Sequence, residues 1–496
     1  MTMLRDKTMA ITVAELVQAS GVAFGTSGAR GLVSAMTDRV CHGYVAGFLS
    51  YLTANGLWKP GGSVALAGDL RPSTPRMLAA CALAVQDMGG VPVFCGYVPT
   101  PALAFFAMEA GLPAIMVTGS HIPDDRNGIK FYRPDGEILK HEEPEILAQP
   151  VHTRSWDAAG MAAELPALAP KQGIGASYVQ RYVDFFGPDS LRGARVGVYQ
   201  HSAVGRDILV EVLEGLGAET IALGRSDRFI PVDTEAVRSE DIALARGWAG
   251  KERLDAIVST DGDSDRPLVA DETGEWLRGD VLAMLCARVL AMRTVVTPVS
   301  SNTVVERSGF FTRVERTRIG SPYVIAAMQA AQAAGETQVC GYEANGGFLL
   351  GSDVRNERGV LTALPTRDAV LPIIAILIAA RGTSISRLLA ELPSRVTFSD
   401  RIADFAPHRS ADLMSWLTDE IEGEARINDM FAPIAGAILT EVNRTDGVRL
   451  TFANGQIIHL RQSGNAPELR CYAEAENQEA AREIAVRALG LIAQRF

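Results

Sequence analysis

Residues 256–266 read Ala-Ile-Val-Ser-Thr-Asp-Gly-Asp-Ser-Asp-Arg, an apolar run that ends abruptly in an acidic loop. The first five residues are typical of a buried strand, so the loop lies at the carboxyl end of that strand. Two other stretches follow the same plan, with loops over residues 119–123 and 341–347. Helical periodicity between them, over 207–216 and 323–334, predicts alternating strands and helices, as in α/β domains that bind ligands at strand carboxyl ends.

The chain has 496 residues, enough for several such domains. Its last part differs, because short strand-like runs such as 447–452 and 456–461 are separated by turns and followed by a helix near 480–494. We therefore expect an α/β fold of three similar mixed α/β domains plus a C-terminal α+β domain around a central cleft. The expected domains are residues 1–155, 170–277, 278–392 and 400–496, with linkers near 144–173 and 392–409.

Composition narrows the class of protein. Against 58 acidic residues there are 47 Lys and Arg, a formal charge of −11, so we expect neither nucleic acid nor a membrane as a partner. Six dispersed cysteines without a C-x-x-C pair indicate a reducing compartment. The longest apolar run, 369–380, is too short to span a bilayer and predicts a buried helix. We find no signal peptide, so a cytoplasmic protein, monomeric or homodimeric, is expected.

The acidic loop predicts a metal site. Asp261, Asp263 and Asp265 alternate, which in an extended segment puts three carboxylates on one side. They repel one another unless a cation lies among them, and oxygen ligands without His or Cys favour Mg²⁺. A solvated acidic turn is one alternative. An EF-hand is excluded, because Arg266 stands where its loop requires glycine and a proline follows. Arg266 is instead suited to contact a phosphate.

The loop over 119–123 carries a hydroxyl and an imidazole, Ser120 and His121, and Lys130 follows nine residues later. The serine lacks the G-x-S-x-G frame of an esterase, so an ordinary turn is an alternative. Beside a Mg²⁺ site, however, a serine can carry a phosphoryl group whose charge the metal and Lys130 neutralise. Lys130 is also suited to proton exchange if neighbouring cations lower its pKa.

Three other segments have polar groups suited to a sugar phosphate. Residues 24–31 are glycine-rich without forming a dinucleotide fingerprint, and the sequence contains no P-loop. Glu343 and Asn345 offer the acceptors and donors that vicinal hydroxyls require. Residues 461–470 gather two arginines and small polar groups, which suits a phosphate or an ordinary charged hairpin. His201 follows a strand-like run, and we expect it to have a structural role.

In this order the loops resemble those of the α-D-phosphohexomutase family, from Phe24 to Arg470. The resemblance implies that Ser120 carries the phosphoryl group and binds Mg²⁺ together with Asp261, Asp263 and Asp265. It also implies catalytic roles for Arg30, His121 and Lys130. The residues implied in substrate binding are Arg266, Thr317, Gly320, Glu343, Asn345, Arg461, Ser463, Gly464, Asn465 and Arg470.

The activity implied is reversible phosphoryl transfer between O6 and O1 of a hexose phosphate, with a hexose 1,6-bisphosphate as intermediate and activator. Asn345, Asn465 and Ser321 depart from the family pattern, in the loops that set specificity. The variants around Asn345 and Asn465 resemble those of bacterial phosphomannomutases, so mannose is the expected sugar. Enzymes that act on glucose or glucosamine phosphates would have similar loops. A phosphatase, or a non-catalytic sugar-phosphate-binding protein on the same fold, is also compatible with them.

Overall fold

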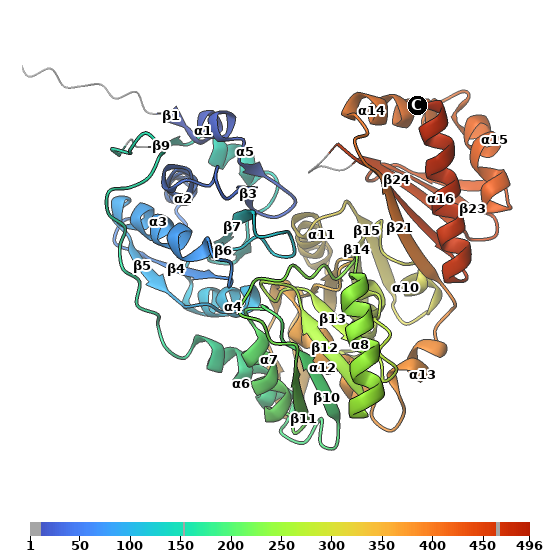
Figure 1. The fold of residues 1–496 in the computed structure, drawn as a ribbon, viewed down its shortest axis with the longest axis horizontal. Coiled ribbons are helices and arrows are strands. Elements are labelled where there is room, and N and C mark those ends of the chain that lie inside the picture. The colour runs from blue at the N-terminus through green and yellow to red at the C-terminus, as the bar shows by residue number, and fades with distance from the viewer. Residues whose placement is uncertain (1–10, 152–153, 463–466) are drawn as a thin grey trace, which may run out of the picture.

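The computed structural model describes residues 11–151, 154–462 and 467–496. They form four consecutive domains along an arc, with the first and the last on either side of its open end (Figure 1). As expected, three are mixed α/β domains and the fourth is an α+β domain. Among the described residues, no helix combines the length and the hydropathy that crossing a membrane requires.

Domain I contains a mixed sheet in the order β2-β3-β7-β6-β4-β5, with β8 paired to β7. Strands β4, β5 and β6 are parallel, whereas β7 is antiparallel to both β6 and β3. Alternate side chains of β4 enter different cores, because Val64 and Leu66 pack with α2 and α3 while Ala65 and Ala67 pack with α4. The elements are β1 (Ile11–Thr12), α1 (Val13–Ser20), β2 (Ala23–Phe24), β3 (Ala29–Leu32), α2 (Asp38–Ala54), β4 (Ser63–Gly68), α3 (Thr74–Asp87), β5 (Val91–Phe94), α4 (Thr100–Ala110), β6 (Ala114–Val117), β7 (Arg126–Arg133), β8 (Gly136–Glu137), α5 (Glu142–Leu147) and β9 (Pro150–Val151).

Domains II and III repeat this plan with smaller sheets, β11-β10-β12-β13 and β15-β14-β16-β17-β20. In each, three parallel strands are followed by an antiparallel one, β13 or β17. Domain II comprises α6 (Ile174–Phe186), β10 (Arg195–Tyr199), α7 (Arg206–Gly215), β11 (Glu219–Leu223), α8 (Ser239–Glu252), β12 (Ala256–Thr260) and β13 (Pro267–Ala270). Domain III comprises α9 (Gly279–Val289), β14 (Thr294–Pro298), α10 (Val304–Arg307), β15 (Arg313–Thr317), α11 (Ser321–Ala333), β16 (Val339–Tyr342), β17 (Phe348–Leu350), β18 (Val354–Asn356), β19 (Gly359–Leu361), β20 (Leu364–Asp368), α12 (Val370–Ala379) and α13 (Ile385–Ala390).

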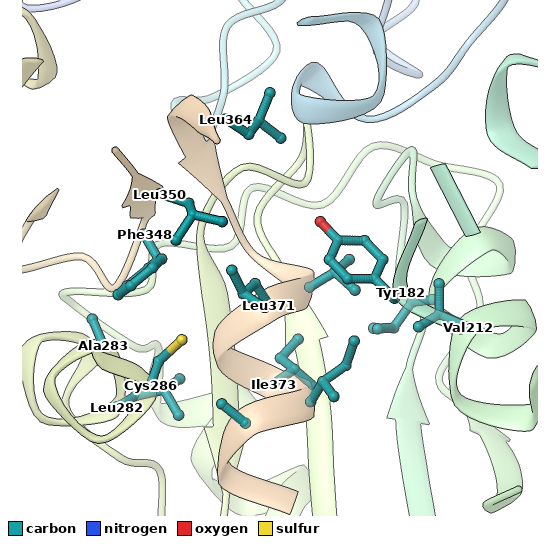
Figure 2. Close-up of a cluster of buried hydrophobic side chains, with 14 of the residues drawn as sticks. Tyr182, Val212, Leu282, Ala283, Cys286, Phe348, Leu350, Leu364, Leu371 and Ile373 are labelled. Carbon is teal, nitrogen blue, oxygen red and sulfur yellow. The ribbon is translucent and has the colours of Figure 1, made fainter. Parts of the chain in front are cut away.

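The apolar run predicted as a core helix is α12. It joins the first three domains, because one continuous cluster of buried side chains includes residues of α4, α6, α9 and α12. Figure 2 shows Leu371 and Ile373 of α12 between Phe348 of domain III and Tyr182 of domain II. A helix that is apolar on all sides is stable only when it is enclosed. Domains I to III therefore share one core, on which their loops are held in fixed relation.

Domain IV has its own core, beneath an antiparallel sheet in the order β21-β25-β24-β23-β22. Its elements are β21 (Val396–Ile402), α14 (Pro407–Leu417), α15 (Gly423–Ala435), β22 (Leu439–Asn443), β23 (Val448–Phe452), β24 (Ile457–Gln462), β25 (Leu469–Ala475) and α16 (Gln478–Arg495). Residues 392–409, predicted as a linker, instead contain β21, which pairs with β25 along its whole length. The polar pair Asp400 and Arg401 lies on this edge strand and conceals its alternation in the sequence.

Candidate active site

Three loops at the carboxyl ends of strands meet where domains I to III adjoin. Ser120 follows β6, the three aspartates follow β12, and Glu343 follows β16. The serine and aspartate loops are in direct contact: Ser120 Oγ donates to Asp261 Oδ2 at 2.6 Å, and Lys130 of β7 binds both Asp263 and Asp265. The third loop is joined to them through an arginine of β20 that binds both Asp265 and Glu343. These side chains are all nearly inaccessible to solvent. The three loops predicted from the sequence thus form one site.

The backbone of Ser120 is left-handed, with φ of 55°. Such a conformation costs a non-glycine residue about 1–2 kcal/mol, so neighbouring contacts must hold it. Arg71 provides them: its guanidinium donates to the carbonyl oxygens of Ser120, Ile122 and Pro123 at 2.5–2.8 Å. Asp69 in turn binds Arg71 Nε at 3.1 Å and accepts from Thr118 Oγ1 at 2.7 Å. The serine loop is therefore wrapped around a buried ion pair.

The aspartate loop has the geometry of a cation site. One oxygen of each carboxylate lies within 4.8 Å of the others. Asp263 Oδ2 accepts from Thr100 Oγ1 and Lys130 Nζ, both at 2.6 Å, and Asp265 Oδ2 accepts from Lys130 at 2.5 Å. The Oδ1 atoms of Asp263 and Asp265 are buried without a hydrogen-bond partner among the described residues. Bare buried carboxylate oxygens fit a hard cation such as Mg²⁺.

A backing segment, residues 200–205, supports the aspartate loop from behind. His201 Nε2 lies 2.8 Å from the carbonyl oxygen of Thr260, and Val204 N donates to Gly262 O at 3.0 Å. Gly205 N donates to Ser264 Oγ at 2.9 Å. Burial lowers the pKa of His201 to about 4, so the ring is neutral and donates through Nε2.

Arg266 and His121 lie next to the serine. Burial, reinforced by the charges of Arg266 and Arg30, lowers the pKa of His121 far below its usual value, so the ring is neutral. Its Nδ1 lies 2.7 Å from a guanidinium nitrogen of Arg266 and must be the acceptor there. Arg266 Nε is buried and has no hydrogen-bond partner among the described residues, which leaves a donor for an anion. The pKa of Arg30 on β3 is lowered to about 10 by burial, so it remains charged at neutral pH.

In the predicted sugar loop, the side chains of Glu343 and Asn345 have different partners. Glu343 Oε2 accepts from Arg367 at 2.9 Å, and the residue is buried. Asn345 Oδ1 instead accepts from Gly347 N at 2.9 Å, so that oxygen shapes its own turn. Thr317 ends β15, and Gly320 follows with φ of 134°.

The two arginines of the predicted phosphate loop, Arg461 and Arg470, are directly opposite each other on β24 and β25 of domain IV. Arg461 Nε donates to Asp446 Oδ1 at 2.9 Å, and Asp446 Oδ2 accepts from the backbone N–H of Ile319 in domain III at 2.9 Å. Ser463, Gly464 and Asn465 lie outside the described residues.

Sequence reasoning missed two arginines, Arg71 and Arg367, both with 1% exposure. Arg71 follows β4, and Arg367 is the fourth residue of β20. Neither arginine belongs to a sequence motif that indicates a particular chemical function. The available signal was an arginine within two residues of an aspartate next to an apolar segment, Asp69 with Arg71 and Arg367 with Asp368. It indicates the buried ion pair of Arg71 with Asp69 but not the partners of Arg367, which are Asp265 and Glu343.

This fold and this site define a multidomain α/β protein with a buried serine hydroxyl beside a cluster of three aspartates that suits a cation. Four family profiles match the chain in order: phosphoglucomutase/phosphomannomutase alpha/beta/alpha domains I, II and III over residues 21–156, 176–274 and 278–396, and the C-terminal domain over 411–491. The chain belongs to the phosphoglucomutase/phosphomannomutase family.

Individual relatives agree with this assignment. The chain is 48% identical over 471 residues to a phosphomannomutase of Salmonella muenchen, covering 95% of each chain. It is 44% identical over 482 residues to a phosphomannomutase of Sinorhizobium fredii, covering 95% of this chain and 99% of that one. The crystal structure of a phosphoglucomutase/phosphomannomutase family protein from Burkholderia thailandensis superposes with a TM-score of 0.69 at 20% identity, covering 95% and 98% of the two chains.

Proposed function

We propose that this enzyme transfers a phosphoryl group reversibly between O6 and O1 of a hexose phosphate, through a phosphorylated Ser120 and a hexose 1,6-bisphosphate. The observation that carries the proposal is the contact of Ser120 Oγ with Asp261 Oδ2 at 2.6 Å. It places a buried hydroxyl at the edge of a carboxylate cluster with bare oxygens. A phosphoserine at residue 120 would have cationic groups on several sides.

The site residues would take distinct parts in the reaction. Asp261, Asp263 and Asp265 would hold Mg²⁺, which when bound offsets charge on the transferring phosphoryl group. Arg266 Nε, a buried donor without a partner among the described residues, would bind a phosphoryl oxygen. Lys130 Nζ lies within 2.6 Å of two of the aspartates and is the group suited to exchange a proton with the attacking hydroxyl.

The two half-reactions balance without another reactant. Phosphorylated Ser120 gives its phosphoryl group to the free hydroxyl of the hexose monophosphate. The hydroxyl proton passes, by way of Lys130 as we propose, to the departing Oγ of Ser120, and the second transfer moves it back. The resulting 1,6-bisphosphate reorients and returns its other phosphoryl group to the serine. Arg461 and Arg470 would hold the distal phosphate in both orientations. Closure of domain IV would exclude the water that hydrolyses phosphoserine.

We propose a mannose phosphate as the preferred substrate. The names of the two curated relatives support this choice, and their identity extends over nearly the whole chain. Glu343 would accept hydrogen bonds from sugar hydroxyls through Oε1, because its other oxygen is bound by Arg367. Glucose and glucosamine phosphates are the competing substrates to test.

A coupled assay tests the proposal. The purified protein is supplied with Mg²⁺ and a trace of hexose 1,6-bisphosphate, and the turnover of mannose 1-phosphate, glucose 1-phosphate and glucosamine 1-phosphate is compared. We expect turnover without net release of inorganic phosphate, fastest with mannose 1-phosphate. Release of phosphate would identify a phosphatase. No turnover and no phosphate on Ser120 would favour a binding protein.

A further inference from the structure

Arg367 lies at the centre of the site although no sequence motif includes it. Its side chain crosses the sugar loop at a glycine: a Cβ atom added to Gly347 would lie 2.7 Å from Arg367 Cδ and 2.8 Å from its Cγ. Carbon atoms do not approach so closely, so any side chain at residue 347 would displace the arginine. Gly347 of the sugar loop thus makes room for Arg367.

The guanidinium of Arg367 binds residues from two domains. Arg367 Nε and one terminal nitrogen lie 3.0 and 2.9 Å from Asp265 Oδ2 in domain II. The other terminal nitrogen lies 2.9 Å from Glu343 Oε2 and 3.3 Å from Ser321 Oγ in domain III. The planar fork of an arginine can bind two carboxylates at once, whereas the point charge of a lysine cannot reproduce both contacts.

These contacts leave a particular oxygen free on each carboxylate. On Asp265, Lys130 and Arg367 share Oδ2, and Oδ1 is buried with no hydrogen-bond partner among the described residues. On Glu343, Arg367 takes Oε2, and no described residue hydrogen-bonds to Oε1. Groups that bind the outer oxygen of a ligand carboxylate set the direction of the inner one.

Electrostatics favour a permanently charged Arg367. Burial alone would lower its pKa, but the carboxylates of Asp265 and Glu343, with Glu137 further away, raise the pKa well above the usual value. Removing one partner of such a buried ion pair leaves an uncompensated charge. The two carboxylates therefore depend on the same cation for their orientation.

We propose that Arg367 is a positioning residue that orients Asp265 toward the metal and Glu343 toward the sugar, and so ties the metal loop of domain II to the sugar loop of domain III. The role of Glu343 in this inference rests on the proposed function. The role of Asp265 requires a metal site but no particular reaction.

The test compares Arg367→Gln and Arg367→Lys with a matched control, Arg181→Gln. Arg181 on α6 is another buried arginine between domains II and III, and it donates to Thr362 O and Oγ1 at 2.6 and 2.7 Å. For each folded variant, calorimetric titration with MgCl₂ gives the metal affinity. The mutase assay gives KM and kcat for mannose 1-phosphate, and thermal unfolding gives the Tm.

We expect Arg367→Gln to weaken Mg²⁺ binding by about 10- to 100-fold and to raise KM as well. Arg367→Lys should recover part of the lost Tm but neither Mg²⁺ affinity nor KM, because one ammonium cannot hold two carboxylates. Arg181→Gln should lower the Tm alone. The lysine variant keeps the test decisive if the glutamine variant does not fold.

The proposal is overturned if Arg367→Lys binds Mg²⁺ and substrate within twofold of the unsubstituted protein. It is also overturned if Arg181→Gln weakens Mg²⁺ binding as much as Arg367→Gln does, because the effect would then be a general loosening of the core. If the unsubstituted enzyme turns over no hexose phosphate, the proposed function fails, while the MgCl₂ titrations still decide the role of Arg367.

Discussion

At the scale of single residues, the site depends on conformations that the surrounding chain enforces. Ser120 adopts a left-handed backbone and is also the proposed phosphoryl carrier. The hydrogen bonds from Arg71 to the carbonyl oxygens of this loop, which we call the Arg71 clamp, stabilise that conformation. They fix the position of the hydroxyl before substrate binds. A nucleophile positioned in advance avoids reorganisation during the reaction.

Replacing Ser120 by alanine should therefore remove catalysis and leave the fold intact. Alanine tolerates the same backbone about as well as serine, and the clamp binds main-chain oxygens that remain. We expect the turnover of mannose 1-phosphate to fall by more than about 10⁴-fold, with a Tm close to that of the unsubstituted protein. The coupled assay and thermal unfolding measure the two quantities. Turnover within tenfold of the original would show that Ser120 is not the carrier.

The buried histidines make stability depend on pH. The pKa of His201 is lowered to about 4, whereas the unfolded chain has the ordinary value near 6.5. Above pH 6.5 neither state binds the proton. Between pH 6.5 and 4 only the unfolded state does, so stability is lost as the pH falls, by up to roughly 3 kcal/mol for this group. His459, with its pKa also lowered to about 4, acts in the same direction.

His201→Gln should be less stable than the original at pH 7.5 and should lose Tm less steeply between pH 6.5 and 4. His408→Gln, at an exposed position, controls for the loss of a histidine. Thermal unfolding across the pH range is the measurement. If the Tm of the original protein and that of His201→Gln fall in parallel as the pH is lowered, groups other than His201 cause the loss of stability in acid.

At the scale of elements, the strand-and-loop pattern of the sequence was informative because each strand is short, apolar and followed at once by polar residues. It located β6, β12 and β16 and the loops that converge on the site. It could not show that β20 brings Arg367 between two of those loops, since that contact depends on how domains II and III pack. It also missed β21, whose polar edge residues resemble a linker.

The all-apolar α12 is the element on which the packing of three domains depends. Leu371 is fully buried within the shared core (Figure 2). Leu371→Ala should lower the free energy of unfolding by about 2–5 kcal/mol, because transfer free energy is lost and a cavity is left. Leu491→Ala on α16, at 37% exposure, provides the same substitution near the surface and should have little effect. Equal Tm losses for the two variants would contradict the inference that the packing of domains I to III depends on α12.

At the scale of the whole molecule, domain IV is joined to domain III by polar contacts. Asn302 Nδ2 donates to Arg395 O at 3.0 Å, and Thr303 N donates to Glu474 Oε2 at 3.1 Å. Polar contacts exchange with water at lower cost than an apolar core, so this junction is suited to movement. The resemblance of the loops implied a four-domain protein, and the sequence placed Arg461 in a phosphate loop. The contact of Arg461 with Asp446 depends on the turn between β22 and β23, and no sequence motif in that turn predicted a contact with the phosphate loop.

Asp446 sets the last prediction, because its carboxylate lies between domains III and IV as a phosphate would. One oxygen binds Arg461 and the other binds the backbone N–H of Ile319. If Arg461 holds the substrate phosphate, that phosphate must compete with Asp446. Asp446→Asn removes the competing charge and should lower the KM for mannose 1-phosphate by about fivefold, which corresponds to about 1 kcal/mol. Asp400→Asn removes an equal charge at an exposed position of the same domain and should leave KM unchanged. A higher KM for Asp446→Asn would show instead that the carboxylate orients Arg461 for the substrate, and the domain junction would then assist binding rather than oppose it.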